Sequence, residues 1–155
     1  MLFTPHVAVG AAIGAATDNP FAAFFIGFGA HFILDLIPHT DTGSYGLEAE
    51  ELIHSPKDLA FIIGDITLGI IILLAGFIKT DFHWPVFWGT FGCLTPDLIL
   101  NLPHTGKYIK QFFPFNYLDW VHKKVHYTIL NKRYYWLGYL TQIVTIALAL
   151  VFIFR

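Results

Sequence analysis

A run of 20 residues with a single charge most constrains how this chain can fold. Residues 59–78 contain one charged side chain, Asp65. A helix rises about 1.5 Å per residue, so a run of this length spans the ~30 Å hydrocarbon core of a bilayer. Residues 134–154 form a run of similar length that has no charge at all. Both runs predict helices that cross a membrane.

The composition of the 155-residue chain favours the same class of protein. Hydrophobic residues make up 55% and charged residues 13%, about half of the ~25% charge of a soluble domain. A soluble domain this small has too much surface to carry so little charge. The hydrophobicity excludes disorder, and a net charge of −2 argues against a nucleic-acid partner. A single cysteine, Cys93, excludes a disulfide framework and a cysteine-based zinc site.

Three more apolar runs complete the expected bundle: residues 2–17, 21–37 and 83–102. The first is short, so a half-inserted helix is the alternative there. It contains Gly10 and Gly14, whose spacing of four lets two helices pack closely in lipid. Residues 112–127 mix aromatic with basic side chains and predict an interfacial amphipathic helix. We therefore expect an all-α, polytopic membrane bundle of about five transmembrane helices plus one interfacial helix, in a single membrane-embedded domain over residues 1–155.

The basic residues predict how this bundle is oriented. If all five runs cross the membrane, residues 38–58 and 103–133 lie on the same side and carry seven of the nine basic residues. Positively charged loops stay on the cytoplasmic side. We therefore expect a multi-pass protein of the inner (cytoplasmic) membrane, surrounded by membrane lipids.

Asp35, Asp65 and Asp97 lie inside apolar runs, where a charged carboxylate is costly. Each costs at least ~2.5–3.5 kcal/mol at the centre of a membrane helix, and their runs contain no lysine or arginine to pair with them. All three are expected in the cytoplasmic leaflet, and His6 begins the first run at the same depth. Histidines and a metal ion are therefore the expected partners of these carboxylates.

Histidines repeat at helical spacing near these carboxylates. His31, Asp35 and His39 are four residues apart, which places them on one face of a helix, and Asp41 follows closely. In the same way, His122 and His126 share one face of the predicted interfacial helix, with the two lysines between them turned away. His83 lies at the opposite end of the bundle, and we expect it to be a helix contact instead.

Imidazole and carboxylate groups are common zinc ligands, and each zinc takes three or four of them. The candidates are too many for one ion, so we predict two or three Zn²⁺ ions that share carboxylates. The predicted metal ligands are His6, His31, Asp35, His39, Asp41, Asp65, Asp97, His122 and His126. Among them, Asp35, Asp65 and Asp97 are the candidate catalytic residues, because one that is not fully engaged as a ligand can accept a proton.

These motifs resemble those of the membrane-bound metal-dependent hydrolases of bacteria and archaea. The matching pieces are Thr4-Pro5-His6 with Gly10, residues 29–41, Asp65, Thr95-Pro96-Asp97 and His122-x-x-x-His126. That family is distantly similar to zinc-dependent phospholipase C and to the single-strand-specific zinc nucleases. The resemblance implies an all-α enzyme with a trinuclear zinc cluster, built from histidine and acidic residues, that hydrolyses phosphoesters.

The expected function is therefore zinc-dependent hydrolysis of a phosphoester, with a lipid-like or other phosphoester small molecule as substrate. Lys107, Lys110, Lys123 and Lys124 are expected around the mouth of the site, where they would favour anionic groups. The alternative is a metal-ion-binding or ion-transport membrane protein without hydrolase activity. An intramembrane metalloprotease is disfavoured because the chain has no His-Glu-x-x-His motif. A membrane di-iron oxygenase is disfavoured because no two histidines are adjacent.

Overall fold

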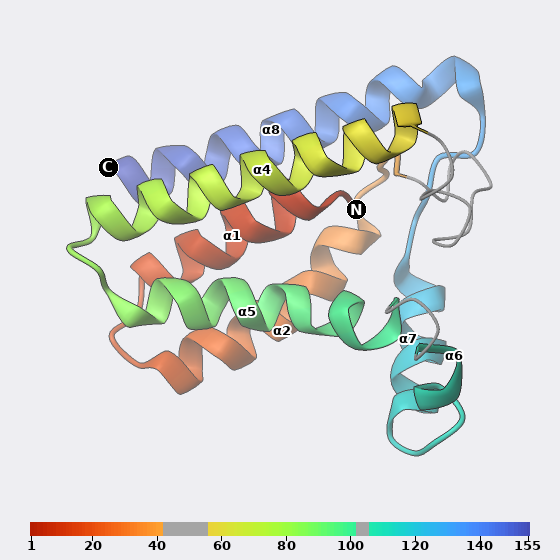
Figure 1. The fold of residues 1–155 in the computed structure, drawn as a ribbon, viewed down its shortest axis with the longest axis horizontal. Helices are drawn as coiled ribbons and strands as arrows, with labels where there is room; N and C mark the ends of the chain where they lie inside the picture. Colours follow the sequence, from red (N-terminus) through yellow and green to blue (C-terminus); the bar gives the residue numbers. More distant parts are fainter. Residues whose placement is uncertain (42–55, 102–105) are drawn as a thin grey trace.

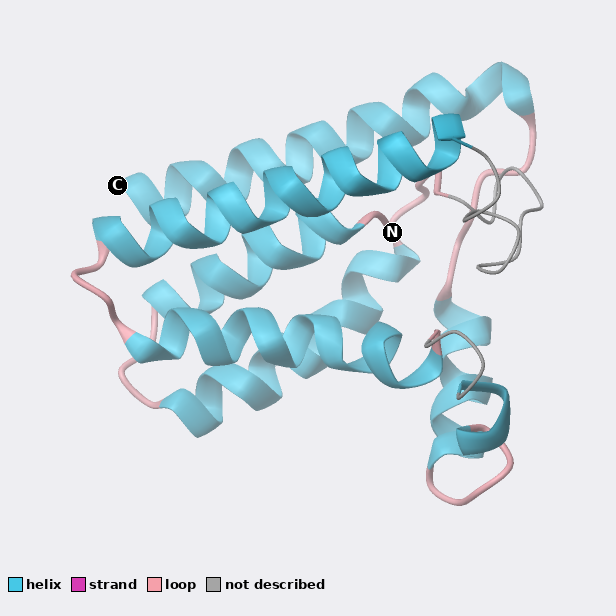
Figure 2. Cartoon of the chain, viewed as in Figure 1, coloured by secondary structure: helices cyan, strands magenta, loops and turns pink. Residues whose placement is uncertain are grey.

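The computed structural model describes residues 1–41, 56–101 and 106–155 (Figure 1). These residues form helices and contain no strand (Figure 2), which confirms the all-α class. Most of the polar segment 38–58 and residue 102 lie outside the described part. The elements are α1 (Phe3–Ala15), α2 (Pro20–Leu36), α4 (Pro56–Lys79), α5 (Trp84–Leu100), α6 (Gly106–Ile109), α7 (Phe115–Val125), the 3-10 turn η2 (Lys132–Tyr134) and α8 (Tyr135–Phe154).

Two of the described helices, α4 and α8, are long and apolar enough to cross a membrane. α4 has 24 residues, and the span Lys132–Phe154, which ends with α8, has 23 residues. The mean hydropathy of the most apolar 18-residue window is 2.5 in α4 and 2.2 in the second span. Only 17% and 22% of their most apolar windows are buried inside the protein, so both helices present apolar side chains outward. α1 and α2 are also apolar but shorter, with 13 and 17 residues.

Helix α1 lies at the centre of the bundle and contacts α2, α4, α5 and α8 (Figure 1). Its small residues make this position possible. A Cβ atom at Gly10 would lie 2.6 Å from the Cα atom of Thr90, and one at Gly14 would collide with the backbone of Pro85. The sequence prediction of close packing at these two glycines is therefore confirmed, and the partner helix is α5.

Proline and asparagine mark the ends of α2. The Asn19 side chain accepts hydrogen bonds from the backbone N–H groups of Phe21 and Ala22, and Pro20 occupies the first position of the helix. At the other end the helix stops at Leu36, just before Pro38. These local signals determine where the chain leaves α2 and enters the loop that carries His39 and Asp41.

The helix predicted within residues 112–127 is present as α7, which contacts α2 and α5 at one end of the bundle (Figure 1). The segment after α7 is hydrogen-bonded to the end of α2. The Tyr127 N–H donates to the Asp35 carbonyl at 2.8 Å, and the Ile129 N–H donates to the His39 carbonyl at 2.8 Å. This pairing holds the C-terminal end of α7 against α2.

Candidate metal centre

Histidine and aspartate side chains from separate parts of the chain meet at one end of the bundle. The first helix provides His6, α2 provides a histidine and an aspartate, and α5 provides Asp97. His39 and Asp41 come from the loop after α2. His122 belongs to α7, and His126 directly follows α7. His6, His31, Asp35 and His39 have no solvent exposure at all. The structure thus brings together eight of the predicted ligands: His6, His31, Asp35, His39, Asp41, Asp97, His122 and His126.

Within this cluster, three groups of residues have ligand atoms within 4.8 Å of one another. The groups are His6 with His31 and Asp97, His31 with Asp35 and His122, and Asp35 with His39 and His126. His31 belongs to two groups and Asp35 belongs to two, so the groups form one continuous cluster. Each group supplies three ligands, which is enough to hold a zinc ion.

Asp35 is the centre of the cluster. Its Oδ2 atom lies 2.9 Å from His122 Nε2 and 3.2 Å from His31 Nε2. Its Oδ1 atom lies 3.5 Å from His6 Nε2 and 3.9 Å from His126 Nε2. The two oxygens therefore face different histidines, which is the arrangement needed for one carboxylate to bridge two ions.

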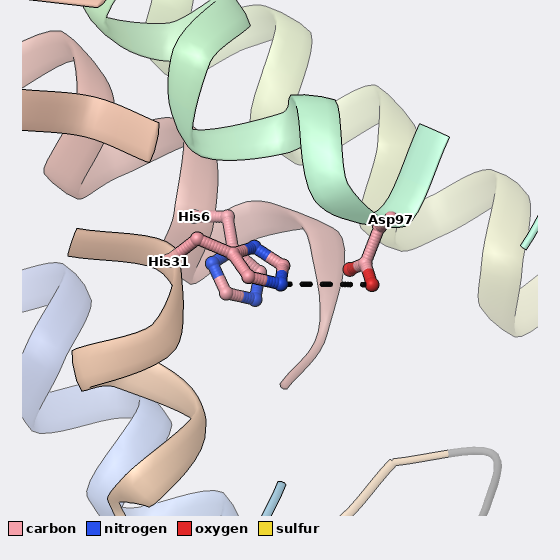
Figure 3. Close-up of side chains that lie close together, drawn as sticks. All are labelled: His6, His31 and Asp97. Carbon is pink, nitrogen blue, oxygen red and sulfur yellow. Dashed lines mark ion pairs between the residues drawn. The ribbon is translucent and has the colours of Figure 1, made fainter. Parts of the chain in front are cut away.

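Asp97 lies at the more open side of the cluster. In Figure 3 the His6 and His31 rings are stacked, with centroids 4.4 Å apart, and Asp97 points toward them. Its Oδ1 atom is 3.8 Å from His31 Nε2 and 3.5 Å from His122 Nε2. The Asp97 side chain is 31% exposed, whereas Asp35 is completely buried. Asp97 is thus the carboxylate of this pair that a molecule from outside can reach.

Backbone carbonyls determine which nitrogen of two histidines faces the cluster. His31 Nδ1 lies 2.8 Å from the Cys93 carbonyl oxygen, and His39 Nδ1 lies 2.8 Å from that of Ile37. A carbonyl can only accept, so both Nδ1 atoms carry a proton, and the Nε2 atom of each ring faces the cluster. The second ring nitrogen of a metal-binding histidine usually donates to a carboxylate, a backbone carbonyl or a water.

These Nε2 atoms point at carboxylate oxygens. His31 Nε2 is 3.2 Å from Asp35 Oδ2, and His39 Nε2 is 3.0 Å from Asp41 Oδ2, which also lies 3.2 Å from His126 Nε2. An Nε2 nitrogen without a proton and a carboxylate oxygen both accept, so each of these close pairs needs a proton or a metal ion between its two atoms. The cluster therefore needs added positive charge.

Two further atoms indicate the same need. His6 Nε2 is fully buried and has no hydrogen-bond partner; its 3.5 Å approach to Asp35 Oδ1 lacks hydrogen-bond geometry. A buried unpaired nitrogen costs about 1–3 kcal/mol, which a bound ion would remove. The Met1 amino group lies 2.7 Å from Asp35 Oδ1 and 3.7 Å from Asp41 Oδ2. Positive charge is therefore favourable beside these two carboxylates.

The loop residues of the cluster have the protonation states that metal ligands require. Burial raises the pKa of Asp41, but the interaction with His39 and the nearby Met1 amino group outweigh burial and lower this pKa to about 2. Burial lowers the pKa of His126 to about 4, and the same amino group acts in that direction. Near neutral pH, Asp41 is therefore ionised and His126 is neutral, as metal binding demands.

Asp65 lies outside the three groups and has a different partner. Its Oδ2 atom accepts a hydrogen bond from the Phe3 N–H at 2.7 Å, and its Oδ1 atom accepts one from the Thr4 N–H at 3.1 Å. Asp65 therefore caps the N-terminus of α1, where a negative charge is favourable. Depth in the membrane suggested Asp65 as a ligand, but depth does not determine the direction in which a side chain points.

The lysines expected at the mouth of the site are engaged with neighbours on α7. Lys110 and Lys123 lie 3.2 Å and 2.6 Å from the two carboxylate oxygens of Asp119. Burial raises the pKa of Asp119, but both lysines outweigh it and hold the pKa below its usual value. Lys124 lies over the Trp120 ring, 4.2 Å from its centroid. The side chain of Lys107 lies outside the described part of the structure.

Gln142 supports the site, although sequence reasoning did not select it. Its Nε2 atom donates to the Thr40 carbonyl at 2.8 Å, and its Oε1 atom accepts from the Leu2 N–H at 2.9 Å. It therefore ties the loop between His39 and Asp41 to α8. One feature of the sequence could have indicated this role, because Gln142 is the single side-chain amide in the apolar run 134–154.

Among the residues that the structure describes, one further histidine, His83, lies at the other end of the bundle. Its Nε2 atom donates to the Thr17 carbonyl at 2.9 Å, so it joins two loops. The buried cluster is thus a set of imidazole and carboxylate groups, without a thiolate, that could hold metal ions. The chain matches no protein-family model, no curated protein and no solved structure.

Proposed function

We propose that this chain is an integral membrane hydrolase that binds two or three Zn²⁺ ions and cleaves phosphoesters. The observation that carries the proposal is the convergence of imidazole Nε2 atoms on Asp35, whose two oxygens face different histidines. Such a shared carboxylate suits a cluster of ions better than one isolated ion.

The donor set favours zinc. Calcium and magnesium prefer oxygen ligands, whereas this cluster offers five imidazoles together with carboxylates. Zinc binds both kinds of group with three or four ligands per ion. The three overlapping groups, which share His31 and Asp35, support two or three ions.

Among the three candidate catalytic residues, the geometry favours Asp97 as the base. Asp65 is engaged in capping α1, and Asp35 is buried among four imidazoles. Asp97 is partly exposed and can accept a proton at the open side of the cluster. Bound zinc would neutralise phosphate charge and lower the pKa of a bound water.

The membrane arrangement supports a lipid-like phosphoester as substrate. We propose a multi-pass arrangement in the inner membrane, in which α1, α2 and α5 complete the bundle formed with α4 and α8. The cluster lies at the end of the bundle where α7 exposes Tyr117 and Trp120, aromatic residues of the kind that favour the membrane interface. Phospholipid headgroups are the most abundant phosphate esters at this depth.

Hydrolysis of a panel of phosphate esters by detergent-purified protein tests this function. The wild type should cleave a phosphomonoester or a phosphodiester in a chelator-sensitive manner. Asp97→Asn should abolish this cleavage, whereas Asp119→Asn, the same change at a carboxylate on α7, should retain it. If the zinc-loaded wild type is no faster than Asp97→Asn on every phosphoester, hydrolysis fails and the metal-ion-binding or ion-transport alternative is favoured.

A further inference from the structure

A cavity of about 300 Å³ lies beside the candidate metal centre, between α4 and α8. These two helices run along the same side of the bundle, and both pack mainly on α1 (Figure 1). Phe61, Gly64 and Leu68 line the cavity from α4, and Tyr139, Ile143 and Ile146 line it from α8. The start of α1, at Leu2 and Pro5, completes the lining.

The polar groups in this lining are already paired within the protein. Asp65 accepts two backbone N–H groups of α1, and the Thr4 hydroxyl donates to the Asp65 carbonyl at 2.7 Å. The Gln142 amide is bonded to Leu2 and Thr40. The surface left for an occupant is therefore mostly apolar, and apolar cavities do not hold water well.

Both walls of the cavity belong to the helices that are suited to cross a membrane. Their apolar windows are only 17% and 22% buried inside the protein. In a bilayer the opening between them would face hydrocarbon chains, with no water nearby. A hydrocarbon chain is therefore the occupant that matches both the lining and the surroundings.

Two residues that line the cavity are also neighbours of the metal centre. Leu2 lines it, and the amino group of the preceding residue, Met1, lies 2.7 Å from Asp35 Oδ1. Gln142 lines it as well and holds the Thr40 carbonyl, between His39 and Asp41, at 2.8 Å. A chain in the cavity would end beside the cluster.

We infer that this cavity holds one hydrocarbon chain of a lipid substrate whose phosphate lies at the metal centre. The inference rests on the proposed phosphoester hydrolysis and names its substrate class. It makes chain length a determinant of activity, because each buried methylene contributes about 0.8 kcal/mol.

A larger side chain at Gly64 should fill the cavity without displacing other atoms. A Cβ atom at Gly64 would meet no other atom within 4 Å, so Gly64→Leu adds a side chain to open space in the lining. Gly29 on α2 is equally open and lies outside the cavity. Gly29→Leu is therefore a matched control for a leucine added to an apolar helix.

The kinetic test compares a phospholipid that carries palmitoyl chains with bis(p-nitrophenyl) phosphate, which has no tail. Gly64→Leu should lower kcat/KM for the phospholipid by about ten-fold or more, the effect of about two lost methylene contacts. It should leave kcat/KM for the tail-less substrate unchanged. Gly29→Leu should leave kcat/KM for both substrates unchanged. Equal rates of wild type and Gly64→Leu on the phospholipid would overturn the inference.

A second measurement does not depend on hydrolysis. A phospholipid with a photoreactive diazirine in one acyl chain should label Phe61, Leu68, Ile143 or Ile146 after illumination. Gly64→Leu should lose this labelling while Gly29→Leu retains it, with outward-facing residues labelled equally in both. Labelling of the cavity that Gly64→Leu does not change would refute the inference. Labelling that behaves as expected, without hydrolysis of any phosphoester, would refute the proposed function alone.

Discussion

Asp35 Oδ2 and His122 Nε2 lie 2.9 Å apart in the buried end of the bundle, although 87 residues separate them in the chain. One belongs to α2 and the other to α7. His31, one helical turn before Asp35, lies 3.2 Å from the same oxygen. A single carboxylate oxygen therefore faces two imidazoles from different helices.

Purified protein should contain about two to three zinc ions per chain, because the three overlapping groups offer about that many sites. Elemental analysis after purification with zinc and without chelator measures this content. Asp35→Ala should remove most of the metal, since Asp35 belongs to two of the three groups. Less than about half an equivalent of zinc in the wild type would contradict the metal centre.

His126→Ala should weaken metal binding by about ten-fold or more, because the change removes a ligand nitrogen from the group that contains Asp35 and His39. His83→Ala should leave the metal content unchanged, since His83 joins two loops at the opposite end of the bundle. Zinc titration of the metal-depleted proteins compares the two variants. Metal loss in His83→Ala but not in His126→Ala would mean that the site is elsewhere.

Asp65→Ala should lower stability and leave the zinc content unchanged. The change removes the cap of α1, which costs about 0.5–2 kcal/mol. Thermal unfolding in detergent measures the loss, and elemental analysis checks the metal. If Asp65→Ala releases zinc without a change in unfolding, Asp65 is a ligand and the capping assignment is wrong.

Residue 110 should face the cytoplasm, because seven of the nine basic residues are expected on that side. A membrane-impermeant maleimide should label Lys110→Cys in inverted membrane vesicles and leave right-side-out vesicles unlabelled. The single native cysteine, Cys93, is buried and should not react. Labelling from the outside would reverse the proposed orientation.

The positions of the helices could be predicted from the sequence because apolar runs, prolines and caps act locally. Residues 21–37 correspond to α2 (Pro20–Leu36), and residues 134–154 correspond to α8 (Tyr135–Phe154). α4 begins at Pro56, three residues before the predicted run 59–78. The predicted apolar run excluded this first turn because the turn contains Lys57 and Asp58, charged residues that the end of a helix tolerates.

The contact between His31 and Asp35 was determined by the sequence itself, because four residues return a helix to the same face. Tertiary structure alone decided which other groups joined them. Local spacing does not specify how a helix is rotated about its axis, and that rotation directs Asp65 to the start of α1 instead of the cluster. It also does not specify how distant segments pair, and the pairing of the chain after α7 with the end of α2 is what brings His126 to His39, 3.3 Å between their Nε2 atoms.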